Sequence, residues 1–157
     1  LLAMGVDEDL ARSAVRLTLG TENDEEQIAR GSRLAEEAGA DEGLMLDPHG
    51  FVNTTNACNF FIVRNGAVWT STGDYCMNGI TRQKVIDLCR ANDIPCFERN
   101  YSLVDTYGAD EAFLTGTFGA QTPVAMIDGR QIGTGDMGPV TKKLRGLYKD
   151  LIAKECA

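Results

Sequence analysis

Two short segments in the second half of the chain combine glycine with hydroxyl side chains in a way that suits an anion. Residues 78–82 read Asn-Gly-Ile-Thr-Arg and open a predicted helix, whose first backbone N–H groups and positive dipole end attract negative charge. Residues 114–120 read Leu-Thr-Gly-Thr-Phe-Gly-Ala and follow a predicted strand, where backbone N–H groups can form an anion-binding nest. Ordinary capped helices and strand ends also look like this, so each segment alone is a weak signal for a phosphate site.

Cysteine and histidine give little support to a metal centre. The five cysteines (Cys58, Cys76, Cys89, Cys96 and Cys156) form no CxxC pair, and the one histidine, His49, lies in a predicted turn over residues 47–50. Zinc sites need several such ligands at short spacings. We therefore expect no metal, and reduced thiols that are partly buried as small apolar groups in a cytoplasmic protein.

Composition excludes several other classes of protein. The 157 residues carry a net charge of -8 with no cluster of lysine and arginine, whereas a nucleic-acid surface needs a basic stripe. No apolar run approaches the ~20 residues that cross a bilayer. Asp7, Glu8 and Asp9 follow the first residues too soon for a secretory signal. The length indicates one domain, or the larger part of one.

The elements that must position the two glycine segments are a mixture of short strands and helices. Asn65-Gly66 is a strong signal for a tight hairpin, and Gly39 suits the end of a helix. The expected helices cover residues 7–12, 24–38, 80–92, 103–107 and 138–155, and Ile80 is expected on the inner face of the third. The expected strands cover residues 13–19, 43–46, 51–55, 59–64, 67–70, 96–101, 112–114, 124–127 and 131–132. Because these elements do not alternate regularly, the pattern predicts an α+β fold.

Several motifs taken in order resemble the class IV aminotransferases that use pyridoxal 5'-phosphate (PLP), of the branched-chain and D-amino-acid type. The motifs are Ala-Gly-Ala-Asp-Glu at 38–42, Leu-Met-Leu-Asp-x-x-Gly-Phe-Val at 44–52, Asn-Phe-Phe-Ile-Val at 59–63, Gly-Ile-Thr-Arg at 79–82, Ala-Asp-Glu-Ala-Phe-Leu-Thr-Gly-Thr at 109–117, Pro-Val at 123–124, Ile-Asp-Gly-Arg at 127–130 and Gly-Pro at 138–139. The resemblance covers about residues 34–157. It implies the C-terminal domain of a two-domain, dimeric fold, with the cofactor between the domains.

The resemblance also implies roles for individual residues. The backbone amides of Ile80 and Thr81 would hold the cofactor phosphate, and Thr117 would supply a further hydroxyl. The amide of Phe118 would hold the substrate carboxylate. Thr54 stands where the family has a glutamate beside the pyridine nitrogen. A carboxylate keeps that nitrogen protonated, whereas a hydroxyl only hydrogen-bonds, so Thr54 implies a weaker electron sink or altered chemistry.

The lysine that the family uses to form a Schiff base with its cofactor is missing from the expected region. Residues 17–33 contain no lysine, and the first lysine of the chain is Lys84. An arginine cannot replace it, because the guanidinium stays protonated and is no amine nucleophile. We therefore assign no catalytic residue from the sequence, and whether the chain is an enzyme by itself stays open.

Residues 1–30 resemble something else, the C-terminal part of a cysteine desulfurase. The stretch Ser-Ala-Val-Arg-Leu-Thr-Leu-Gly at 13–20 carries this likeness, and Arg16 would there bind a substrate carboxylate. The resemblance implies a boundary between an N-terminal segment, residues 1–33, and the aminotransferase domain, residues 34–157. That segment is expected to form a short helix, strand and helix.

Three functions follow from these observations. The first is PLP-dependent transfer of an amino group between an amino acid, of branched-chain type, and a 2-oxo acid, in a homodimer or together with a missing N-terminal domain. The second is a non-catalytic domain that binds phosphate or PLP, or serves in assembly, which the missing lysine and Thr54 favour. The third is a lyase of the same fold, such as one acting on aminodeoxychorismate.

Overall fold

The computed structural model describes residues 13–18, 33, 35–116 and 119–156. Its strands are β1 (Ser13–Thr18), β2 (Glu42–Leu46), β3 (Val52–Thr55), β4 (Asn59–Arg64), β5 (Ala67–Thr70), β6 (Cys96–Glu98), β7 (Glu111–Gly116), β8 (Ala120–Pro123), β9 (Met126–Ile127) and β10 (Arg130–Gln131). Its helices are α2 (Ile80–Ala91), α3 (Leu103–Tyr107) and α4 (Pro139–Glu155). No helix among these is long and apolar enough to cross a membrane.

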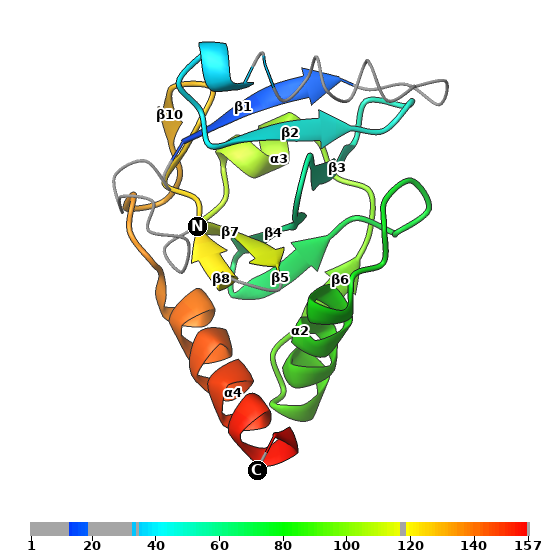
Figure 1. Cartoon of the computed structure of the whole chain (residues 1–157), viewed down its shortest axis with the longest axis vertical. Coiled ribbons are helices and arrows are strands. Elements are labelled where there is room, and N and C mark those ends of the chain that lie inside the picture. The colour runs from blue at the N-terminus through cyan, green and yellow to red at the C-terminus, as the bar shows by residue number, and fades with distance from the viewer. Residues whose placement is uncertain (1–12, 19–32, 34, 117–118, 157) are drawn as a thin grey trace.

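The strands form one mixed sheet, which branches at β4. The path runs β10-β9-β1-β2-β3-β4-β5-β6, and β7 pairs with β4 on one side and β8 on the other. β1 lies parallel to β2 and β9, and β5 is parallel to β6, while the other pairs are antiparallel. In Figure 1, β1 and β2 form the upper part, α3 lies beneath them, and α2 and α4 lie side by side below β4, β5 and β7.

Strand β4 is the centre of the core because both of its faces are buried. Phe60 and Ile62 face the cluster that includes β2 and α3, while Phe61 and Val63 face the cluster under α2 and α4. Alternate residues of a strand point to opposite faces, so the uninterrupted apolar run of β4 fits a strand covered on both sides. Phe61 also stacks on Phe113 of β7, with ring centroids 5.0 Å apart.

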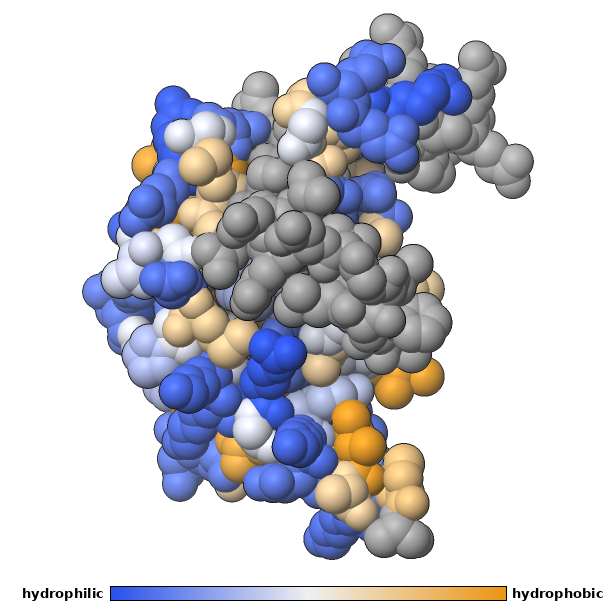
Figure 2. Space-filling model, turned by 60° about the vertical axis from the view of Figure 1, so that its left-hand side comes forward, coloured by the Kyte–Doolittle hydropathy of each residue, from blue (hydrophilic) through white to orange (hydrophobic). Residues whose placement is uncertain are grey.

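The helical layer is amphipathic and mainly polar outside. Val85, Ile86 and Cys89 of α2 and Leu144 of α4 are buried against the sheet. Figure 2 shows a mainly hydrophilic described surface on the α4 side, with a small apolar area low in the view, where α4 ends. Ile152 of α4 is 47% exposed in that part of the helix.

Helix α4 begins on a buried carboxylate from a distant strand. Glu111 of β7 is only 6% exposed, and its two carboxylate oxygens accept the backbone N–H groups of Val140 at 2.9 Å and Thr141 at 2.8 Å. A side chain at Gly138 would collide with it, because a Cβ there would lie 2.1 Å from the Glu111 Cδ atom. The carboxylate therefore satisfies the first turn of α4 and interacts with the positive end of its dipole.

Most predicted elements are confirmed, with some differences in extent. The strand predicted over residues 13–19 is β1, and the helices predicted over 80–92, 103–107 and 138–155 are α2, α3 and α4. The Asn65-Gly66 hairpin is confirmed, with positive φ at both residues. Residues 33 and 35–37 are helical, and the turn that follows them contains Gly39, whose φ is +70°. The helix predicted over 7–12, and most of the one predicted over 24–38, lie outside the described residues.

Two strand predictions are wrong in detail. The strand predicted over residues 96–101 ends at Glu98, because the chain then crosses from β5 to β3. The Arg99 N–H donates to the Thr70 carbonyl, whereas the Tyr101 carbonyl accepts from the Val52 N–H. The strand expected over 124–127 covers only Met126 and Ile127, and β8 before it was not predicted.

Removing the Glu111 carboxylate should destabilise the fold. Glu111→Ala would leave two N–H groups of α4 without partners in a buried place, so we expect a loss of about 2–4 kcal/mol in the free energy of unfolding. Urea denaturation followed by circular dichroism measures this loss. Asp150→Ala, at an exposed position of the same helix, is the control and should change stability by less than about 0.5 kcal/mol. Equal stability of the two variants would contradict this account of the α4 N-terminus.

Candidate functional site

A cavity of about 610 Å³ opens between the ends of β3, β4 and β7 and the start of α2. Its size lies within the roughly 300–1,000 Å³ of typical ligand pockets. Residues from five parts of the chain line it: Met45 of β2; Thr54 and Thr55 of β3; the turn and strand residues Asn56, Ala57, Cys58 and Asn59; the loop residues Tyr75, Cys76, Met77, Asn78 and Gly79 with Ile80 and Thr81 of α2; and Thr115 and Gly116 of β7. None of these described lining residues carries a charge at neutral pH.

The N-terminus of α2 borders this cavity. Gly79 precedes the helix in an extended conformation, and the first helical hydrogen bond runs from the Gln83 N–H to the Gly79 carbonyl at 3.0 Å. The N–H groups of Ile80 and Thr81 therefore have no partner within the helix. Among the described residues, no side chain caps α2 and no acidic residue lies in its first turn. The positive end of this helix can therefore attract an anion.

The loop that leads into α2 is held by two asparagines of the sheet. Asn59 donates its side-chain amide to the Met77 carbonyl at 2.8 Å, and Asn53 donates to the Tyr75 carbonyl at 2.6 Å. Asn59 also lies so close to the helix start that a Cβ at Gly79 would be 2.5 Å from its Oδ1 atom. The glycine is therefore needed at this position by packing, although its φ is ordinary.

Thr115 adds a buried hydroxyl to the cavity wall. It lies opposite Asn59 in the β4–β7 pairing and is 3% exposed. Its Oγ1 atom has no hydrogen-bond partner among the described residues. Buried hydroxyls normally find a partner, so this atom has an unused capacity for a hydrogen bond.

Thr54 lies in β3, and Cys58 lies in the turn between β3 and β4. The Thr54 hydroxyl donates to the Cys58 carbonyl at 2.8 Å, so its proton is already used within the turn. Cys58 contacts the buried carboxylate of Glu42, with its sulfur 3.2 Å from Oε1, while the Thr55 hydroxyl donates to the other oxygen. Burial, followed by the Glu42 charge, raises the pKa of the Cys58 thiol to about 12. Cys58 is therefore a protonated thiol and not a thiolate nucleophile.

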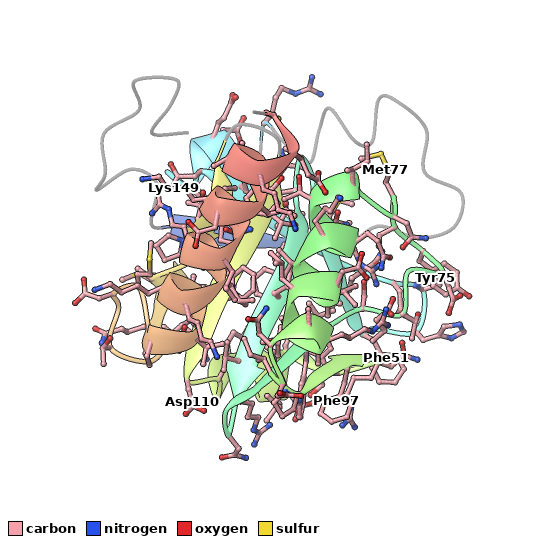
Figure 3. All side chains as sticks on the ribbon, turned by 90° about the horizontal axis from the view of Figure 1, so that it is seen from below. Phe51, Tyr75, Met77, Phe97, Asp110 and Lys149 are labelled. Atoms are coloured by element: carbon pink, nitrogen blue, oxygen red, sulfur yellow. The ribbon has the colours of Figure 1, made fainter. Side chains whose placement is uncertain are left out.

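The rim of the cavity is apolar and exposed. Met77 is 79% exposed and Ile80 is 81% exposed, and Tyr75 nearby is 46% exposed. The expectation that Ile80 lies on the inner face of α2 is wrong, because its side chain lies on the rim. Figure 3 shows Met77 and Tyr75 on the same side of the molecule as α2.

The structure brings together three of the five predicted binding residues, since Thr54, Ile80 and Thr81 all line the cavity. Thr117 and Phe118 lie outside the described residues, directly after Gly116 of the cavity wall. The side chain of Arg16 is not described either. Lys84 points elsewhere, because its Nζ lies 2.9 Å from Oε1 of Glu155 in α4. His49 lies in the predicted turn, where its N–H donates to Asp47 at 2.9 Å.

Sequence reasoning missed the roles of Asn53, Asn59 and Thr115. Thr115 could have been found, because it belongs to the glycine segment at residues 114–120 that the sequence analysis assigned to anion binding. Asn53 and Asn59 read as ordinary strand residues. Their contacts with the loop span 22 and 18 residues along the chain, which no local pattern predicts.

A model of the family "Amino-transferase class IV" matches residues 26–127. The chain belongs to this family. It is 46% identical over 114 residues to the branched-chain-amino-acid aminotransferase-like protein 2 of Arabidopsis thaliana, covering 73% of this chain and 20% of that protein. It is 43% identical over 115 residues to the branched-chain-amino-acid aminotransferase of Pseudomonas aeruginosa, covering 73% of this chain and 38% of the relative.

Solved structures of the family show the same fold. The branched-chain amino acid aminotransferase from Escherichia coli superimposes with a TM-score of 0.80 at 27% identity, over 90% of this chain and 52% of that one. An aminotransferase from Brucella abortus bound to the cofactor PLP gives a TM-score of 0.79 at 31% identity, over 89% of this chain and 54% of that one. The predicted family, the α+β fold and the family's cofactor are thereby confirmed.

The chain spans about half of these solved chains and two fifths or less of the two curated relatives. The family match begins at residue 26. The resemblance of residues 1–30 to a cysteine desulfurase is not shown by these matches and stays a prediction, as does a domain boundary between residues 33 and 34.

Adding a methyl group at the helix start should disturb the site. Gly79→Ala would place a Cβ against the Asn59 amide, which must then release the Met77 carbonyl, so we expect a loss of about 1–3 kcal/mol in the free energy of unfolding. Gly146→Ala in α4 meets nothing within 4 Å and should stabilise the helix by roughly 0.5–1 kcal/mol. Chemical denaturation of the two variants compares them. A gain in stability from Gly79→Ala would show that the close approach of Asn59 is not needed.

Proposed function

We propose that the cavity holds the phosphate end of PLP at the N-terminus of α2, within an enzyme that transfers amino groups between a branched-chain amino acid and a 2-oxo acid. The observation that carries this proposal is the uncapped start of α2 beside the buried, unpartnered hydroxyl of Thr115. The names of the relatives supply the amino-acid class.

The residues present fit the cofactor phosphate. A phosphate dianion needs several hydrogen-bond donors, and the amides of Ile80 and Thr81 with the hydroxyls of Thr81 and Thr115 provide them. No carboxylate lies among the described lining residues to repel it. In this proposal Thr117 adds a further hydroxyl and the Phe118 amide receives the substrate carboxylate, next to Gly116 at the end of β7.

Thr54 faces the aromatic end of the cofactor in this proposal. Bound PLP supplies an electron sink for the carbon next to the amino group of a substrate. Because the Thr54 proton is donated to the Cys58 carbonyl, its oxygen offers lone pairs to the ring but no negative charge. The described cavity residues therefore bind and orient the ring, with weaker support for a protonated pyridine nitrogen than a carboxylate gives.

The amine that the reaction needs comes from outside this chain in the proposed enzyme. The five lysines of the chain all lie in α2 or α4, and none of them is among the residues that line the cavity. A second domain or a second copy of the chain, covering the apolar rim formed by Tyr75, Met77 and Ile80, would supply the amine and close the cavity. Amino transfer thus depends on a larger assembly, whereas phosphate binding does not.

A non-catalytic PLP-binding domain is the second candidate. The same absence of a cavity lysine favours it, together with Thr54 in place of a carboxylate. The two candidates share the phosphate site and differ in whether any assembly of the chain turns over amino acids. Incubation of a dimer of the chain, or of its complex with a second domain, with leucine, 2-oxoglutarate and PLP separates them, since only the first candidate forms glutamate.

Losing the Thr115 hydroxyl should weaken binding of pyridoxamine 5'-phosphate. In Thr115→Val the methyl replaces the hydroxyl at equal size, and one hydrogen bond to the phosphate is lost. We expect a cost of about 1–2 kcal/mol, or roughly 5- to 30-fold in Kd, by calorimetric titration. Thr141→Val is the matched control, because its hydroxyl is equally buried and unpartnered but lies outside the cavity. Equal affinity of the two variants would contradict the proposed phosphate site.

Borohydride reduction of the chain mixed with PLP should leave the cavity without attached cofactor, because no lysine lines it. Peptide mapping by mass spectrometry measures the attachment, and pyridoxamine 5'-phosphate, which has no aldehyde, is the control ligand. Stoichiometric attachment at Lys84 would overturn the expectation. That result would require its ammonium to leave Glu155 and reach the cavity.

A further inference from the structure

A buried carboxylate lies directly behind one end of the cavity wall. Glu42 opens β2 and is 6% exposed, and it is not among the residues that line the cavity. Its Oε1 atom accepts a hydrogen bond from the Cys58 thiol at 3.2 Å, and its Oε2 atom accepts one from the Thr55 hydroxyl. Both donors line the cavity, so Glu42 lies one residue behind its wall.

The contacts of Glu42 fit an ionised carboxylate without a positive partner. An ionised carboxylate only accepts hydrogen bonds, and each of the two oxygens receives a donor here. None of the ion pairs between described residues includes Glu42. Ala14 of β1 lies opposite it in the register, and Cys58 is the titratable described residue in contact with it. Buried charges are usually paired, so the negative charge of Glu42 acts on its surroundings with little compensation.

Glu42 also decides where the protons at this end of the cavity point. The Cys58 thiol and the Thr55 hydroxyl donate to Glu42, and the Cys58 carbonyl is a second acceptor for Thr55 at 2.7 Å. The Thr54 hydroxyl donates to the same carbonyl at 2.8 Å. Burial, followed by the Glu42 charge, raises the pKa of the Cys58 thiol to about 12, so the sulfur keeps its proton. The three side chains therefore offer lone pairs, and no donor, to a molecule in the cavity.

The other end of the cavity has the opposite character. The uncapped start of α2 offers backbone N–H groups and the positive end of the helix dipole. Asn59 packs against Gly79 at this start, whereas the Cys58 sulfur lies near Gly116, where a Cβ would be 3.1 Å from it. The cavity thus runs from a donor end beside α2 to an acceptor end beside the turn between β3 and β4. PLP has a matching polarity, with an anionic phosphate and, across the ring, a nitrogen that can carry a proton.

We propose that Glu42 is a positioning residue for the ring nitrogen of the cofactor, which it favours in the protonated form through the side chains of Cys58 and Thr55. This inference rests on the proposed cofactor site, because a phosphate held at α2 directs the ring toward the acceptor end. A protonated nitrogen is a positively charged donor, and it strengthens the electron sink that PLP supplies. The negative charge that Thr54 lacks is in this way provided from β2.

The test is the protonation of the ring nitrogen in pyridoxamine 5'-phosphate that carries nitrogen-15 in its ring. The chemical shift of this nitrogen, followed across pH, gives its pKa in the free and in the bound ligand. Bound to the unaltered chain, the nitrogen should keep its proton to a higher pH than in the free ligand. Glu42→Gln keeps the size of the side chain and one accepting oxygen, but removes the charge. We expect it to lower the proton affinity of the bound nitrogen roughly tenfold.

Glu111→Gln is the matched control. Glu111 and Glu42 are both 6% exposed, but Glu111 binds the start of α4 and lies outside the cavity. This control should leave the pKa of the bound nitrogen as it is in the unaltered chain.

The outcomes separate this inference from the cofactor site on which it rests. An equal pKa of the bound nitrogen in Glu42→Gln and in the unaltered chain would overturn the role of Glu42 and leave the site standing. Failure of the ligand to bind the unaltered chain would overturn both. If Glu42→Gln does not fold, the unaltered chain decides by itself. A nitrogen that loses its proton at lower pH when bound than when free contradicts a carboxylate acting from behind the wall.

Discussion

The pairing of β4 with β7 is the constraint on which the rest of the structure depends. Five residue pairs, from Asn59 opposite Thr115 to Val63 opposite Glu111, fix the register of two strands that are each buried along nearly their whole length. A shift by one residue would turn every apolar side chain to the wrong face. The same register places Asn59 and Thr115 at the cavity end and Glu111 at the α4 end. Core packing and site geometry are therefore set by one ladder of hydrogen bonds.

The N-termini of the two long helices, α2 and α4, differ in the groups that lie against them. Both follow a glycine in an extended conformation, and neither has a capping side chain from its own N-cap residue. The start of α4 is filled by the Glu111 carboxylate, an anion that belongs to the protein. The start of α2 lies against a neutral cavity wall. The α2 end lies beside a buried hydroxyl and has no such carboxylate among the described residues, and the proposed phosphate would bind there.

Local patterns predicted much of the fold and part of the site. The Gly-Ile-Thr segment and the Asn65-Gly66 hairpin depend on neighbouring residues, so their placement follows from rules for helix starts and turns. The parallel pairing of β1 with β2, the Glu111 contact with α4 and the asparagine contacts with the 75–79 loop join distant segments. No rule of periodicity or capping specifies such partners. Thr115 is an example. The sequence shows a hydroxyl side chain there, but only the structure shows that this hydroxyl is buried without a hydrogen-bond partner among the described residues.

Phosphate binding and amino-group chemistry need different groups. Among its described residues, this chain has donors that suit a phosphate at the cavity but no amine there. Holding a phosphate needs backbone amides and hydroxyls, and these donors do not depend on the charge of the side chains around them. Forming a bond to a cofactor aldehyde needs an amine within reach, and Lys84 is tied to Glu155 on the helical surface. The residues that would tune the ring, Thr54 and the protonated thiol of Cys58, are neutral as well. The described cavity residues thus suit an anionic ligand, as the proposed phosphate site requires, and in that proposal the amine comes from a partner that covers the rim.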